Sequence, residues 1–154
     1  MALHRWAGEA QRSSGGRVTR LEAIHLTLAF LGEVEEGRLP ELKALQLTGS
    51  RHLLPIEQAR YWTRNRIVWV GPGETPGPLL ALANDLNREL QARQFRSEAR
   101  EFAAHITLIR NAHAPGALPD LPPVRWPVEE CVLVESRAAG AGRTYEVLAR
   151  YALA

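Results

Sequence analysis

The sequence is poor in cysteine, in lysine and in long apolar runs, and each shortage excludes a class of protein. The single cysteine among 154 residues, Cys131, rules out an internal disulfide framework and favours a reducing cytoplasm. No run approaches about eighteen consecutive apolar residues, and the N-terminus lacks the apolar core of a signal peptide, so we expect no membrane span and no export.

The charges are nearly balanced, with 19 basic and 17 acidic residues and a net charge of +2. This balance does not by itself indicate nucleic-acid binding. Lys43 is the only lysine. The arginine bias is compatible with a phosphorylated ligand, because guanidinium binds phosphate in a planar, bidentate way. A GC-rich coding sequence also explains the bias, and we give this explanation most of the weight.

The length and the 45% hydrophobic content predict one domain with a real core, spanning residues 1–154. Apolar periodicity and the positions of glycine and proline predict both helices and strands, with strands in the majority. The α+β class follows, since many neighbouring strands can pair antiparallel. The predicted helices are 1–12, 39–47 and 78–94, the strands are 24–31, 53–62, 66–70, 105–109, 128–135 and 145–151, the hairpin turns are 63–65 and 138–142, and 114–123 is a surface loop.

A four-residue pattern occurs twice, as His25-Leu26-Thr27-Leu28 and as His105-Ile106-Thr107-Leu108. Side chains alternate between the two faces of a strand, so each copy presents one imidazole and one hydroxyl on one face and two aliphatic groups on the other. Since each half of the chain offers a helix and a motif strand, we expect a pseudo-symmetric domain of two lobes.

Two histidines delivered in this way indicate an acid and a base. Imidazole has an ordinary pKa of about 6.5 and works in either role near neutral pH. Opening a cyclic phosphodiester needs one neutral imidazole to take a proton from the nucleophile and one imidazolium to protonate the departing oxygen. The hydroxyl groups of Thr27 and Thr107 can donate hydrogen bonds to the phosphoryl oxygens.

Other interpretations of the histidines were weighed. A single such histidine is more often a satisfied core residue, but the doubled pattern favours catalysis. A metal site is the next rival, although neither copy has the further histidine, carboxylate or cysteine ligands typical of zinc sites. The remaining histidines, His4, His52 and His113, are expected to be solvated and without a role.

With segments 66–71, 132–136 and 145–148, the two motifs give the chain a resemblance to the two-histidine phosphoesterases. Within them it most resembles the bacterial and archaeal RNA 2',3'-cyclic phosphodiesterases, also called 2'-5' RNA ligases, from about Gly16 to the C-terminus. The resemblance implies a bilobal fold of antiparallel sheets with outer helices, in which the two motif strands face each other across a central cleft.

The resemblance also implies roles for five residues. His25 would donate a proton to the leaving 3' oxygen and His105 would accept one from water, leaving a 2'-phosphate. Thr27, Thr107 and Arg110 would bind the phosphate, without metal or cofactor. In ligation, the reverse reaction, the acid and base exchange roles.

Two features of the sequence depart from the pattern of that family. The family usually has a further strand before the first motif, which is expected to be missing here, and Ala104 stands where a proline often precedes the second histidine.

The sequence leaves the substrate open. The leading hypothesis is a cytoplasmic monomer that acts on RNA with 2',3'-cyclic phosphate or 2'-phosphate ends. The alternatives are a phosphodiesterase for small cyclic nucleotides or 2',5'-linked oligonucleotides, and a non-catalytic module that binds RNA ends.

Overall fold

A computed structural model describes residues 1–96, 101–140 and 142–154 of the chain. Two compact units emerge, and each is described by itself. Unit 1 comprises Met1–Thr27, Leu54–Thr75 and Ala103–Trp126, and unit 2 comprises Leu28–Leu53, Pro76–Phe102 and Pro127–Ala154. The antiparallel sheets and the few helices confirm the predicted α+β class. Within the described ranges, no helix is long and apolar enough to cross a membrane.

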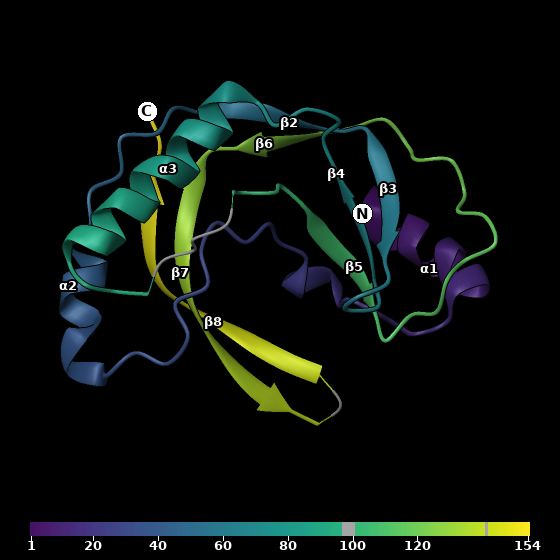
Figure 1. Ribbon diagram of the computed structural model, residues 1–154, viewed down its shortest axis with the longest axis horizontal. Helices are drawn as coiled ribbons and strands as arrows, with labels where there is room; N and C mark the ends of the chain where they lie inside the picture. Colours follow the sequence, from purple (N-terminus) through teal and green to yellow (C-terminus); the bar gives the residue numbers. More distant parts are fainter. Residues whose placement is uncertain (97–100, 141) are drawn as a thin grey trace. The chain divides into compact units, whose positions relative to one another are not determined.

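Unit 1 is built on a four-stranded sheet whose strands lie in the order β1-β5-β4-β3. Figure 1 labels three of them, β3, β4 and β5. Its bounds are Arg17–Val18 for β1, Gln58–Trp62 for β3, Ile67–Gly71 for β4 and Ile106–Arg110 for β5. All three pairings are antiparallel. The predicted hairpin around residues 63–65 is confirmed as β3–β4.

Helix α1, Ala2–Ser14, supports one edge of this sheet through contacts with β1 and β5. Its buried residues Leu3, Trp6, Ala7 and Ala10 recur at spacings of three and four, so they form one apolar stripe. Gly15, which has a φ of 60°, ends the helix, because this left-handed conformation suits glycine. The helix predicted over residues 1–12 is therefore confirmed.

Unit 2 combines α2, Leu39–Lys43, and α3, Gly77–Ala92, with the hairpin of β7, Glu130–Ala139, and β8, Gly142–Ala152. Its core is the buried cluster of Leu42, Leu45, Leu90 and Phe95. The helix predicted over 78–94 is confirmed by α3. The one predicted over 39–47 is shorter: α2 ends at Lys43, and its last turn tightens as the Leu45 N–H donates to the Leu42 carbonyl at 3.2 Å, with Leu45 in the core of unit 2. Farther along, the backbone N–H and the hydroxyl of Thr48 both donate to Asp85 Oδ2 on α3, at 3.3 and 3.2 Å.

Two strand predictions in the first half of the chain were wrong in extent. The strand expected over 24–31 is reduced to a single bridge at Leu26, because the chain passes from unit 1 to unit 2 after Thr27, and Ala29 and Leu31 pack on the core of unit 2. The strand expected over 53–62 divides at Glu57 into β2, His52–Ile56, and β3, because β2 pairs with β6 while β3 pairs with β4.

The strand β6, Val124–Val128, was not predicted as a separate element. Pro122 and Pro123 directly precede it and Pro127 lies within it, so this segment resembles a loop in sequence. The final hairpin runs farther toward its turn than expected, with Ala139 paired to Gly142. Gly140, with a φ of 59°, provides the turn.

Candidate active site

The two motifs are neighbours in unit 1. Leu26 forms an isolated antiparallel bridge with Ile106, the middle aliphatic residue of the second motif. The first motif therefore lies beside β5 within unit 1, joined to it by this bridge.

This bridge determines which side chains share a face. In an antiparallel pair, the residues on either side of a bridge are also opposite each other, so His25 lies across from Thr107, and Thr27 lies across from His105. Leu26 and Ile106 point to the buried side, and Ile106 is 0% exposed. The two imidazoles and two hydroxyls therefore form a square on the other face, with the imidazoles on one diagonal and Cβ atoms about 7–8 Å apart along it.

Both imidazoles are held in the same way. Nδ1 of His25 lies 2.7 Å from the carbonyl oxygen of Ala23, and Nδ1 of His105 lies 2.8 Å from that of Ala103. A carbonyl only accepts, so Nδ1 carries the hydrogen in each ring, and any proton transfer by these rings would have to use Nε2. Nε2 of His25 also lies 3.0 Å from Oγ1 of Thr27.

A β-bulge brings Arg110 to the same face. Val68 on β4 pairs with Ile109, but the next residue, Trp69, pairs with Thr107, so β5 has one residue, Leu108, more than its partner. Leu108 and Ile109 are consecutive and both 0% exposed. The alternation of faces is thereby shifted by one residue, and the exposed Arg110 returns to the face of Thr107.

A second arginine, which the sequence analysis missed, lies beside it. Arg17 on β1 is the direct cross-strand partner of Arg110, so both side chains are on the same face. Both are exposed, and neither forms an ion pair with any carboxylate of the described ranges. Two opposed guanidinium groups without a counterion are typical of an anion site. Only the register of distant strands reveals this pair.

Two tryptophans, also missed, line the ring of His105. The ring centroids of Trp62 and His105 are 4.7 Å apart at an interplanar angle of 59°, and those of Trp69 and His105 are 6.2 Å apart, edge to face. The two indoles contact each other at 4.7 Å. We call Trp62 and Trp69 the aromatic wall. The signal for it was the pair of tryptophans flanking the predicted hairpin turn.

Gly71 allows the chain before His105 to approach β4. A Cβ atom at Gly71 would lie 2.7 Å from the carbonyl oxygen of Ala104 and 3.3 Å from the ring of Trp69. Any side chain there would displace the backbone next to the histidine or the aromatic wall. Glycine at this position therefore helps to position His105.

The remaining histidines are outside this arrangement. His113 is exposed, as expected, whereas His4 and His52 are half-buried. The expectation that His52 is solvated was wrong at Nε2, which is buried without a hydrogen-bond partner among the described residues. The part of the chain that the structure describes contains no group of three or more His, Cys, Asp or Glu side chains that could hold a metal ion.

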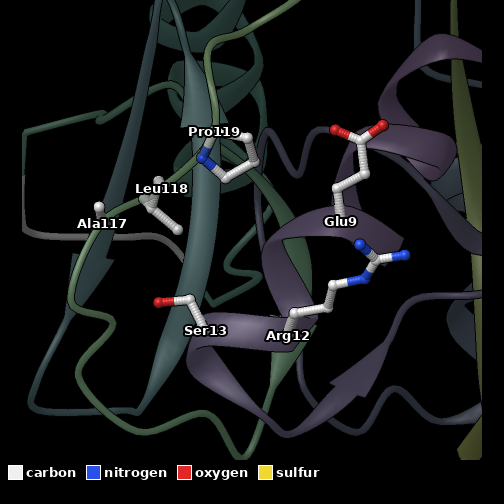
Figure 2. A pocket seen from close by; sticks show the side chains of 6 residues that line it. All are labelled: Glu9, Arg12, Ser13, Ala117, Leu118 and Pro119. Atoms are coloured by element: carbon white, nitrogen blue, oxygen red, sulfur yellow. The ribbon is translucent and has the colours of Figure 1, made fainter.

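A pocket of about 480 Å³ in unit 1 is separate from the candidate site (Figure 2). Figure 2 shows Glu9, Arg12 and Ser13 of α1 on one side and the segment of Ala117, Leu118 and Pro119 on the other. None of these residues belongs to the motifs. This pocket is open and does not include a histidine, so its chemistry differs from that of the square.

Comparisons with known proteins place the chain in one family. The family model described as LigT like phosphoesterase matches residues 1–69. The chain is 34% identical to the RNA 2',3'-cyclic phosphodiesterase of Escherichia coli K12 over 152 residues, which cover 96% of this chain and 86% of that protein. It is also 34% identical to the enzyme of the same name from Thermus thermophilus over 148 residues, which cover 84% of this chain and 72% of that protein.

A crystal structure of E. coli LigT complexed with 3'-AMP superposes with a TM-score of 0.85 at 31% identity, covering 99% of this chain and 89% of that one. The same protein has been crystallised with phosphate, and that structure gives a TM-score of 0.78 at 30% identity over 98% of this chain and 90% of that one. These similarities cover both motifs and nearly the whole fold.

Proposed function

Since the chain belongs to the family of LigT-like phosphoesterases, which includes RNA 2',3'-cyclic phosphodiesterases, we propose that it hydrolyses the 2',3'-cyclic phosphate at the end of an RNA to a 2'-phosphate. The observation that carries the proposal is the bridge between Leu26 and Ile106, because it gathers two imidazoles and two hydroxyls on one face. The chemistry needs no cofactor, because all the proton transfers are between side chains and substrate.

In the proposed reaction the two histidines act on opposite sides of phosphorus. His105 Nε2 takes a proton from water as the water oxygen bonds to phosphorus. The bond from phosphorus to O3' breaks, and His25 Nε2 gives its proton to O3'. The carbonyl groups of Ala23 and Ala103 support this by keeping the Nδ1 hydrogen in place and Nε2 directed at the substrate.

The phosphate is bound by the groups around the imidazoles. The hydroxyls of Thr27 and Thr107 donate to its nonbridging oxygens, where negative charge increases in the transition state. Arg110, and with it Arg17, supply charge-assisted hydrogen bonds. The support for including Arg17 is its position directly opposite Arg110.

The decisive experiment is a product assay on a dinucleotide that ends in a 2',3'-cyclic phosphate, with the 2'- and 3'-phosphate products resolved. We expect only the 2'-phosphate, and His25→Ala and His105→Ala each to lower turnover by about two to four orders of magnitude, the usual contribution of a positioned acid or base. His113→Ala, which changes an exposed histidine outside the square, is the matched control. Wild-type turnover in either motif variant would refute the proposal.

The same assay tests the alternatives. A strong preference for a cyclic mononucleotide over the dinucleotide would favour small cyclic nucleotides, a substrate class suggested by the 3'-AMP complex of the E. coli relative. Tight binding of the cyclic end without turnover would favour a module that binds RNA ends. The proposed setting is the cytoplasm, which the single cysteine favours, and the proposed state is a monomer.

A further inference from the structure

Phe30 is the most exposed large hydrophobic side chain of the described ranges, at 60%. It lies in unit 2 between Ala29 and Leu31, which both pack against the core of that unit. Since its neighbours on both sides point to the core, the ring of Phe30 points away from it. A single exposed apolar residue needs no explanation, so the case for a site depends on what surrounds this ring.

An arginine without a counterion lies over the ring. The Cζ atom of Arg96 is 5.6 Å from the ring centroid of Phe30, within the range of a cation–π contact. Arg96 is exposed and forms no ion pair with a carboxylate in the part of the chain that the structure describes. Gly32 leaves the space that the guanidinium occupies, because a Cβ atom there would lie 3.1 Å from Nη1 of Arg96. We call Phe30 and Arg96 the stacking pair.

The end of α3 fixes the backbone from which Arg96 extends. Gln94 has a φ of 59°, and its N–H donates to the Gln91 carbonyl at 3.0 Å. The Phe95 N–H donates to the Leu90 carbonyl at 2.9 Å. These two bonds around a left-handed residue form a Schellman motif, which is often accompanied by an apolar contact back to the helix. Phe95 and Leu90 make this contact in the buried cluster of unit 2, so the next residue, Arg96, emerges at the surface beside Phe30.

The two groups of the stacking pair are groups on which proteins bind unpaired nucleobases. Bases of single-stranded RNA stack on phenyl rings and on the plane of an arginine guanidinium. A guanidinium without a carboxylate partner also attracts the phosphodiester of the strand. An apolar protein partner needs no such charge beside the ring, so the stacking pair fits a nucleotide better than it fits a protein surface.

The position of Phe30 in the sequence relates it to the proposed phosphate site. Only three residues of chain lead from Thr27 to Phe30, so covalent geometry limits the distance between their Cα atoms to about 11 Å. Thr27 is one of the proposed ligands of the cyclic phosphate. A base bound by Phe30 therefore belongs to a nucleotide next to the cyclic end rather than to a distant part of the RNA.

We propose that the stacking pair binds the nucleobase of the nucleotide that precedes the cyclic end, and that Arg96 also binds the phosphodiester between these two nucleotides. This inference rests on the proposed hydrolysis and names its substrate class, which is an RNA of at least two nucleotides. The chemistry at phosphorus stays the same, since the stacking pair acts only on the binding of the strand.

The test compares kcat/KM for three substrates. They are adenosine 2',3'-cyclic phosphate, the dinucleotide ApA ending in a 2',3'-cyclic phosphate, and the same dinucleotide without the base of its first nucleoside. We expect the wild type to prefer the complete dinucleotide to the mononucleotide by about tenfold. Removal of the first base should lower kcat/KM for the dinucleotide by about five- to tenfold, the lower part of the range for one stacked base.

Variants of the stacking pair should change this preference for the complete dinucleotide. Phe30→Ala should lower it by about five- to tenfold, and removal of the first base should then cost less than about twofold, because the ring and the base are the two partners of one contact. Phe30→Tyr, which keeps the ring, should change the preference by less than about threefold, and Arg96→Gln should lower it severalfold. The matched controls are Leu53→Ala, an exposed apolar residue of unit 2, and Arg88→Gln, an exposed arginine of α3, and neither should change the preference.

The outcomes separate this site from the proposed hydrolysis. Equal kcat/KM for the complete and the base-free dinucleotide in the wild type would overturn the site and leave the hydrolysis intact, whereas no 2'-phosphate from any of the three substrates would overturn the hydrolysis itself. A Phe30→Ala protein that is slower by one common factor on all three substrates would show that the ring only supports the fold of unit 2, which also overturns the site.

A protein surface is the other possible use of the ring, and it has its own readout. A wild-type dimer in size-exclusion chromatography that Phe30→Ala converts to a monomer, at an unchanged preference for the dinucleotide, would assign the ring to an interface between copies and overturn the site. Should Phe30→Ala fail to fold, the base-free dinucleotide still decides, because that comparison uses the wild type alone.

Discussion

Replacing Arg17 with glutamine is expected to raise stability and lower activity in the same protein. Arg17 and Arg110 are direct cross-strand partners, and both are exposed. Like charges opposite each other destabilise a sheet by about 0.2–1 kcal/mol. Coulomb's law agrees, since two unit charges about 7 Å apart in water repel by about 0.6 kcal/mol. Salt at about 0.15 M, with a Debye length of about 8 Å, reduces this to about 0.25 kcal/mol.

Glutamine keeps most of the stem and a polar end but removes the charge, so the repulsion disappears. A gain of about 0.25 kcal/mol should raise the Tm by about 0.5–1 °C, because 1 kcal/mol corresponds to about 2–4 °C in a chain of this length. The kcat/KM for a cyclic-phosphate dinucleotide should fall by about tenfold or more, because a hydrogen bond from a charged group contributes about 1.5–3 kcal/mol.

The assay combines thermal unfolding with initial rates for the wild type, Arg17→Gln and Arg17→Lys. The lysine variant keeps the charge and should keep the Tm of the wild type. The difference in Tm should shrink in about 1 M NaCl, where the Debye length is about 3 Å. Added inorganic phosphate should raise the Tm of the wild type more than that of Arg17→Gln, since a ligand stabilises the state that binds it. An Arg17→Gln protein with a lower Tm, or with unchanged kcat/KM, would refute the reasoning.

Three further predictions concern the hydroxyls, metal and alkaline pH. Thr27→Val and Thr107→Val should each lower kcat by about 10- to 100-fold with little change in the Tm, because each removes one donor to the phosphoryl oxygens; equal rates in both variants and the wild type would contradict this. Prolonged treatment with EDTA should leave the rate unchanged, and loss of activity that zinc restores would revive the metal hypothesis. Burial, and to a smaller extent Glu130, raises the pKa of Cys131 from its ordinary 9.0 to about 11. The unfolded chain therefore loses this proton first, and the free energy of unfolding should fall as the pH rises from 9 to 11. The fall should be smaller in Cys131→Ala, as measured by urea midpoints.

Most of what could be predicted about the site came from the four-residue pattern that occurs twice, at residues 25–28 and 105–108. Alternation along a strand was sufficient to group His25 with Thr27 and His105 with Thr107, and the contact of His25 Nε2 with Thr27 Oγ1 agrees with that grouping. The helix over residues 78–94 followed from an apolar stripe at helical spacing, and the one over residues 1–12 from the serine and glycine cluster that ends it. Such signals are local, and local patterns are what a single sequence records best.

The remaining features of the site and of the sheet could not be predicted, because they depend on the register between segments that are distant in the sequence. No spacing along the chain indicates that Leu26 bridges Ile106, or that Arg17 lies opposite Arg110. The strand expected over 24–31 does not form for a similar reason, because its apolar residues are divided between two units and those after Thr27 pack in unit 2. Trp62 was passed over because an aromatic residue at the end of a strand is more often part of a core.

The β-bulge at Leu108 explains why the cation stands three residues after the second threonine. In an unbroken strand, residues two or four positions after Thr107 would share its face, and a residue three positions after it would point into the core. Deleting Leu108 would therefore remove the bulge and leave Arg110 two positions after Thr107, still on the face of that threonine. A search for distant members of this family should treat a two-residue gap between the threonine and the arginine as the mark of an inserted residue, and an odd-numbered gap as the signature of a chain that lacks it.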